Sequence, residues 1–232
     1  MNPEFFGLPE VDPFSVLDRE ITRLNEFLTG LRQEQWHAST RCEGWTVRDM
    51  VAHLDSDEEY NEACLNDTLE ALVADFTDLD GFNDRQIRKR AHLSNAEILN
   101  QWRARQARVR RAWEQLGLDA KIKTSIGPYP LHAQIWHITS EYATHADDLG
   151  VEVPPDEQAS RIRWRVQFSA FTVQERDDSP ALERREDRIL VTLRDHQLSL
   201  SLDDFVRAVT ARLTLPENPD DRRVIKALRT LA

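Results

Sequence analysis

The chain has 232 residues, of which 40% are hydrophobic and 31% charged, and its formal net charge is −11 at pH 7. This composition indicates a soluble globular protein with one large domain, or with one medium domain and a small appendage. The acidic balance argues against nucleic acids and anionic membrane surfaces as partners, because both require a basic face.

Sequence features also indicate the compartment. No apolar run reaches the roughly 18 residues that a membrane span needs, and the first residues lack the basic and apolar regions of a secretory signal. The two cysteines, Cys42 and Cys64, are too few for a disulfide framework and form no Cys-x-x-Cys pattern. We therefore expect a cytoplasmic protein.

The first predicted element is a long amphipathic helix. Asp12 is a good N-cap, and Pro13 suits the first helical position. Apolar residues then recur at alternating intervals of three and four, at Phe14, Leu17, Ile21, Leu24, Leu28 and Leu31. This period predicts a bundle-type helix that ends near Gly30.

A second helix is predicted from Thr46, where Asp49 completes a capping-box pattern. His53 lies on the flank of its apolar stripe, at the border between core and solvent. By itself such a residue is more often a satisfied boundary histidine than a metal ligand. The acidic stretch 75–83, which contains Gly81, is predicted to be a loop.

A capping box at Ser94 and Glu97 predicts the start of a third long helix, which ends at Gly117. Five arginines crowd this helix, at Arg103, Arg105, Arg108, Arg110 and Arg111. They indicate a solvated basic face that offsets the acidic chain. The alternative is that one or two of them contact an anionic substrate.

The fourth helix is predicted to follow a loop at residues 127–130, to open at Pro130 and to close at Gly150. His145 falls within its apolar stripe, and a polar line along the edge of the stripe contains Gln134, His137, Glu141 and Asp148. Glu141 and His145 are four residues apart, so their side chains point the same way. A divalent metal would offset the cost of burying them, whereas an ordinary solvated pair is the alternative.

These four helices predict a mainly α fold, a four-helix bundle over residues 13–150 whose core can hold a metal. Residues 151–232 read as a small α+β region packed on the bundle. We expect there a helix from Asp156, short strands at 188–193 and 197–202, a helix from Asp203 to Leu213, and a last helix between Pro219 and Leu231.

Two segments carry a family resemblance. Gly-Trp-Thr-Val-Arg-Asp-Met-Val-Ala-His-Leu spans residues 44–54, and Glu-Tyr-Ala-Thr-His-Ala-Asp-Asp spans residues 141–148. Their combination resembles the mycothiol-dependent maleylpyruvate isomerase-like proteins of the DinB superfamily, over roughly residues 13–150. The resemblance implies a DinB-like four-helix bundle in which His53, Glu141 and His145 bind one divalent metal.

The resemblance also implies an actinobacterial enzyme with mycothiol as thiol cosubstrate and a small electrophile as substrate. A metal-bound thiol loses its proton and becomes a nucleophile, so S-transfer or thiol-assisted isomerisation is expected. The metal is zinc in the first place, with nickel, iron, cobalt or manganese as alternatives. Asp148 and His137 are the candidate catalytic residues. Asp148 would orient a ligand imidazole, with a helix cap as the alternative; His137 would act as an acid or base, with a helix-edge histidine without a catalytic role as the alternative.

Several alternatives remain open at this stage. The chain could be a metal enzyme that uses no thiol, for hydrolysis or rearrangement, or a DinB-like protein that binds a ligand without catalysis. It could be a monomer or a homodimer. The resemblance further implies that the isomerase proper carries a larger C-terminal domain than the residues that follow the bundle here.

Overall fold

The computed structural model describes residues 7–74 and 78–231. By its internal contacts the chain divides into two compact units. One unit is Pro13–Val151, and the other combines the residues up to Asp12 with those from Glu152 onward.

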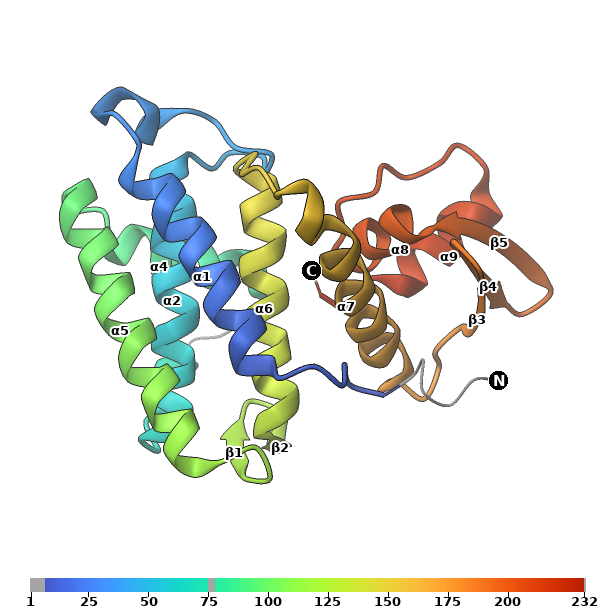
Figure 1. Ribbon diagram of the computed structural model, residues 1–232, viewed down its shortest axis with the longest axis horizontal. Helices are drawn as coiled ribbons and strands as arrows, with labels where there is room; N and C mark the ends of the chain where they lie inside the picture. The colour runs from blue at the N-terminus through green and yellow to red at the C-terminus, as the bar shows by residue number, and fades with distance from the viewer. Residues whose placement is uncertain (1–6, 75–77, 232) are drawn as a thin grey trace. The chain divides into compact units, whose positions relative to one another are not determined.

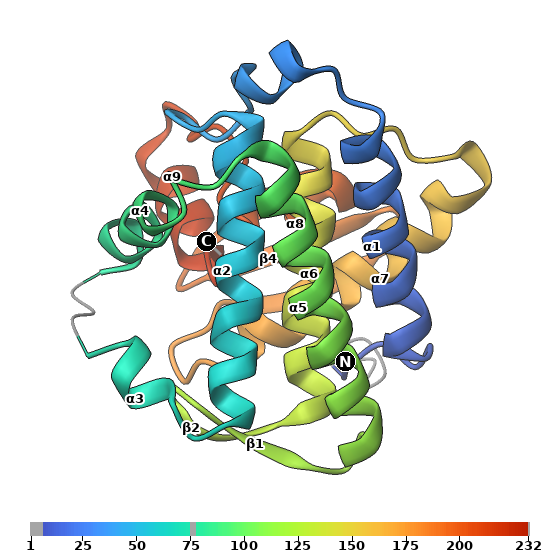
Figure 2. The same cartoon turned by 90° about the vertical axis from the view of Figure 1, so that its left-hand side faces the viewer.

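The first unit is a bundle of four long helices, α1 (Pro13–Thr29), α2 (Val47–Leu65), α5 (Asn95–Leu116) and α6 (Leu131–Asp148). In Figures 1 and 2, α1 and α6 run in one direction along the bundle, and α2 and α5 run in the other. α2 and α5 share a direction because the chain returns along the bundle between them. The prediction of a mainly α fold with a four-helix bundle is confirmed.

The predicted helix ends rest on local hydrogen bonds. Thr46 and Asp49 form the capping box of α2, and Ser94 and Glu97 form that of α5, both as predicted. Gly117 ends α5 with a positive φ of 78°, a conformation that costs glycine little because it has no Cβ.

The connection from α2 to α5 corrects a prediction. It contains two short helices, α3 (Leu69–Leu72) and α4 (Leu79–Lys89), so the loop predicted at 75–83 is wrong from residue 79 onward, and residues 75–77 lie outside the described residues. The carboxylate of Asp78 accepts a hydrogen bond of 2.7 Å from the backbone N–H of Gly81. This cap starts a helix in a stretch whose acidic residues and glycine suggest a loop.

A second correction concerns residues 127–130, which form a strand rather than a loop. β2 (Gly127–Pro130) pairs antiparallel with β1 (Lys121–Thr124), with Lys121 opposite Pro130. In a two-stranded ribbon each strand is an edge, and prolines are tolerated there because their missing N–H can face away from the partner strand. A short 3₁₀ helix, η2 (Gln33–His37), follows α1.

The second unit contains α7 (Pro155–Gln174), a three-stranded antiparallel sheet, α8 (Leu202–Val209) and α9 (Pro219–Leu228). The sheet has the order β3 (Ala181–Arg185), β4 (Arg188–Leu193) and β5 (His196–Ser201). The sequence did not reveal β3, because its only buried residue is Leu182. The helix predicted from Asp203 to Leu213 instead begins at Leu202, capped by Ser201, and ends at Val209 shortly before Ala211, whose φ is positive.

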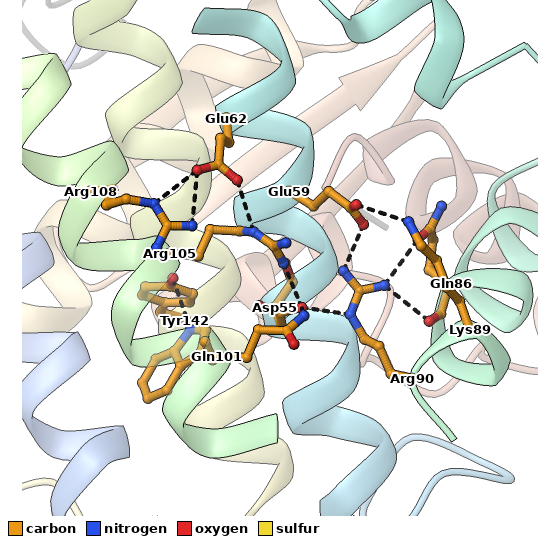
Figure 3. A network of polar contacts seen from close by, with 11 residues as sticks. Asp55, Glu59, Glu62, Gln86, Lys89, Arg90, Gln101, Arg105, Arg108 and Tyr142 are labelled. Carbon is orange, nitrogen blue, oxygen red and sulfur yellow. Dashed lines mark hydrogen bonds and ion pairs between the residues drawn. The ribbon is translucent and has the colours of Figure 1, made fainter. Parts of the chain in front are cut away.

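The bundle core is apolar but encloses a buried carboxylate, Asp55 on α2. Its Oδ2 accepts from Arg90 Nε at 2.6 Å, from Arg105 Nη1 at 2.6 Å and from Gln101 Nε2 at 2.9 Å (Figure 3). The network joins α2, α4 and α5, because Arg90 directly follows α4. Two positive charges thus balance one carboxylate that water does not reach.

The arginines of α5 therefore do not form a simple solvated face. Arg105 and Arg108 both pair with Glu62, and Arg105 has only 13% of its side chain exposed. Arg103 and Arg110 bond to residues of α1, Asn25 and Asp18. These partners give the four arginines a structural role between helices.

Among the described residues, no helix has both the length and the apolar character that a bilayer crossing requires.

We expect Asp55→Ala to lower the free energy of unfolding by about 3–5 kcal/mol, because it removes the buried carboxylate between Arg90 and Arg105 and leaves these guanidinium groups only the partly exposed Glu59 and Glu62 as acidic partners. Chemical denaturation measures the change. Asp18→Ala is the matched control: its pair with Arg110 is exposed and is worth less than about 1 kcal/mol. Equal losses in the two variants would contradict the role assigned to Asp55.

Candidate metal centre

Two helices of the bundle bring three potential metal ligands together. His53 lies in the second turn of α2, and Glu141 and His145 lie one turn apart on α6. Each offers one ligand atom, and these atoms all lie within 4.8 Å of one another. The two imidazole rings meet edge to face, with their centroids 4.8 Å apart, and both are buried.

His145 is held between two carboxylates. Its Nε2 lies 3.2 Å from Glu141 Oε2, and its Nδ1 lies 3.1 Å from Asp148 Oδ2. Burial alone would lower the pKa of His145, but hydrogen bonds with Asp148, Cys42 and Glu141 raise it well above its ordinary value. The surroundings of this ring thus favour a positive charge.

The residues fit a divalent cation. Two imidazoles and one carboxylate are ordinary ligands for zinc and similar metals, at about 2.0–2.2 Å from the ion. Ligand atoms on opposite sides of such an ion are at most about 4.4 Å apart, close to the separations found here. The bond from Asp148 to Nδ1 of His145 leaves Nε2, the nitrogen beside Glu141, as the ligand atom.

Asp148, predicted as a catalytic residue, connects this centre to the loop before α2. Its Oδ2 also accepts a hydrogen bond from Cys42 Sγ at 3.2 Å, and its backbone oxygen accepts one from Arg41 N at 3.1 Å. Cys42 is half-buried, and with His145 and Asp148 it forms a second group of potential ligands. The geometry favours an orienting role for Asp148 over a mere helix cap.

His137, the other predicted catalytic residue, lies outside both of these groups of potential ligands. It is one turn before Glu141, and its Nε2 lies 3.1 Å from the hydroxyl of Tyr129 on β2. Burial lowers the pKa of His137 to about 4, and the charge of Glu141 opposes this only in part. The ring is therefore neutral at pH 7, and its catalytic role stays a prediction.

Asp57 is a residue of this region that the sequence reasoning missed. It lies one turn after His53 on α2, with Oδ2 3.3 Å from His53 Nε2. Burial, and next the charge of Glu141, raise the pKa of Asp57 well above its ordinary value, while His145 lowers it. The signal was present: Asp57 follows His53 at the same spacing of four that singled out Glu141 and His145.

The fold and the donor set together define a DinB-like helical bundle with a candidate two-histidine, one-carboxylate metal site. The sequence model of the family described as "Mycothiol maleylpyruvate isomerase N-terminal domain" matches residues 17–150, more than half of the chain. The chain belongs to this family, and the predicted family membership is confirmed.

Two solved structures are similar over nearly the whole chain. They are crystal structures of the mycothiol-dependent maleylpyruvate isomerase and of a histidine-to-alanine mutant of it. Each has a TM-score of 0.67 and 17% identity, and the alignment covers 93% of this chain and 98% of that chain. At this identity the likeness shows the fold. A comparison with the curated proteins found no match.

The extent of this likeness corrects one expectation. Because the alignment covers 98% of the isomerase chain, the isomerase has no C-terminal domain much larger than the region that follows the bundle here. The similar fold therefore extends through the second unit as well as the bundle.

The low pKa of His137 predicts a pH-dependent stability. An unfolded histidine takes up a proton near pH 6.5, whereas folded His137 does so only near pH 4. The contribution of the neutral His137 ring to the free energy of unfolding is therefore complete above about pH 6.5. It is lost as the pH falls towards 4, by up to about 3 kcal/mol. Denaturant titrations of the metal-free protein between pH 4 and 7.5 measure this slope.

His137→Gln should make that slope shallower. His92→Gln is the control, because His92 is exposed. A slope that His137→Gln leaves unchanged would contradict the assignment.

Proposed function

We propose that this protein is a divalent-metal-dependent enzyme that activates a low-molecular-weight thiol, mycothiol, for thiol-assisted isomerisation of a small electrophile. The observation that carries the proposal is the convergence of His53, Glu141 and His145 in a bundle of this family. Membership of a mycothiol maleylpyruvate isomerase family, and the likeness to the structures of that isomerase, support the thiol and the type of reaction.

The proposed ligand set leaves chemistry to be done at the metal. Three protein ligands leave at least one position open, as in catalytic rather than structural sites. When bound, a divalent cation would lower the pKa of a thiol entering that position, so that a thiolate forms at neutral pH. We infer zinc first and nickel, iron, cobalt or manganese as alternatives, because this ligand set suits all of them.

The surrounding side chains orient the ligands. Asp148 accepts the Nδ1 proton of His145 and thereby keeps the Nε2 lone pair directed towards Glu141. Glu141 contributes a negative charge, which partly balances that of the cation. Neutral His137, bonded to Tyr129, lies one turn before Glu141 and at neutral pH would act as a base rather than as an acid.

A thiol can isomerise an activated double bond without net consumption. The sulfur adds to one carbon, a C–S bond forms, and the π electrons move to the conjugated carbonyl oxygen. Rotation about the resulting single bond follows; the electrons then return and expel the thiolate. Maleylpyruvate, named for the relatives, has such a cis double bond and is the first substrate to test. If the sulfur stays and the carbon takes a proton from water, the outcome is S-transfer.

The test is metal content and thiol-dependent turnover in the same protein. We expect about one divalent ion per chain by elemental analysis, and turnover of maleylpyruvate only when mycothiol is present. His53→Ala, Glu141→Ala and His145→Ala should each bind the metal far more weakly and lose at least about 100-fold of the activity, because each removes one of three ligands. His92→Ala, at an exposed position, is the control.

Two other results would contradict the proposal, and each would indicate a different function. A protein that holds metal but turns over substrates without thiol would be a thiol-independent metal enzyme. A protein that binds no metal, and whose properties do not change in His53→Ala and His145→Ala, would be a non-enzymatic ligand-binding member of the family.

A further inference from the structure

We propose that Asp57 is a further positioning residue of the metal centre, which holds the imidazole of His53 in the orientation needed to meet Glu141 and His145. The inference rests on the proposed metal site and extends it by a residue outside the three ligands.

The geometry of the two facing helices supports this role. α2 and α6 run in opposite directions in the bundle (Figure 1). Each carries a histidine and a carboxylate four residues apart: His53 and Asp57 at 3.3 Å on α2, and His145 and Glu141 at 3.2 Å on α6. Both pairs belong to the same cluster, because the two rings are in edge-to-face contact.

The second carboxylate at His145 shows what role such a partner has. His145 has Asp148 as an orienting partner in addition to Glu141. Carboxylates that bond to ligand imidazoles fix the ring orientation and raise its basicity. Asp57 contacts Nε2 of His53, whereas Asp148 contacts Nδ1 of His145; it would therefore orient the His53 ring with Nδ1 as the ligand atom, so that each ligand histidine has an orienting carboxylate.

The partners of the neighbouring acids on α2 separate Asp57 from the structural ion pairs. Asp55 meets Arg90 and Arg105, and Glu59 meets Lys89 and Arg90. Asp57 instead contacts the imidazole of His53, and the charges of Glu141 and His145 on α6 act on it more strongly than that of Arg90.

The test is the metal affinity of substituted proteins, measured by competition with a chelator of known affinity. We expect Asp57→Ala to bind the metal about 10–100-fold more weakly, the usual effect of losing such a partner, with an unchanged stoichiometry. Asp57→Asn should recover part of the loss, because its amide oxygen can keep the polar contact with the ring. Glu59→Gln should bind like the wild type; Glu59 is on the same helix, and its side chain has the same exposed fraction as Asp57, 22%.

A double variant shows whether Asp57 acts through His53. In the His53→Ala background, adding Asp57→Ala should weaken the remaining metal affinity by less than about twofold, because the ring that Asp57 orients is already gone. A general loss of folding would instead lower the affinity in both backgrounds. Thermal melts of the metal-free single variants check that Asp57→Asn, at least, retains the fold.

The outcomes separate this inference from the proposed function. If the wild type binds metal and Asp57→Ala binds it equally tightly, the positioning role is overturned and the three-ligand site stands. If Asp57→Ala weakens binding equally in both backgrounds, Asp57 does not act through His53 and the inference is also overturned. A wild type that binds no metal overturns both.

Discussion

The bundle of this protein is constrained by the need to balance charge where water is excluded. An isolated carboxylate in such a place is costly unless a cation, a proton or hydrogen bonds compensate it. Helix α2 carries a run of acidic residues that face the interior or its border, and within about one turn Asp55, Asp57 and Glu58 resolve this cost in three different ways.

The first two ways are an ion pair at Asp55 and the uptake of a proton at Glu58. Asp55 is balanced by the guanidinium groups of Arg90 and Arg105 (Figure 3). Glu58 is shifted towards its neutral form: burial raises its pKa to about 7, although hydrogen bonds from Tyr142 and Asn61 oppose the shift. Tyr142 also accepts a bond from Trp102 Nε1 at 3.1 Å, so this carboxyl group sits in a connected network of buried polar groups.

The sequence predicted the parts of this architecture that depend on local patterns. The apolar periods and the capping boxes at Thr46 and Ser94 gave the long helices, and the spacing of four gave the pair of Glu141 and His145. Helix α4 and the β1–β2 hairpin were missed, because short elements depend on single caps and cross-strand partners more than on periodicity. The neighbouring position of His53 could not follow from local pattern at all, since it is set by how α2 and α6 pack; the family resemblance supplied it.

The proposed function depends on the third way of balancing charge. Asp57, Glu141 and Asp148 lie around two imidazoles, and the described contacts of this cluster balance it chiefly through a proton on His145. In the proposed function a metal ion would take the place of that proton, whereas the arginines at Asp55 are fixed by the chain. Of the three acidic clusters, this is therefore the one at which the proposed function places a cation, and with it the thiol that the cation would activate.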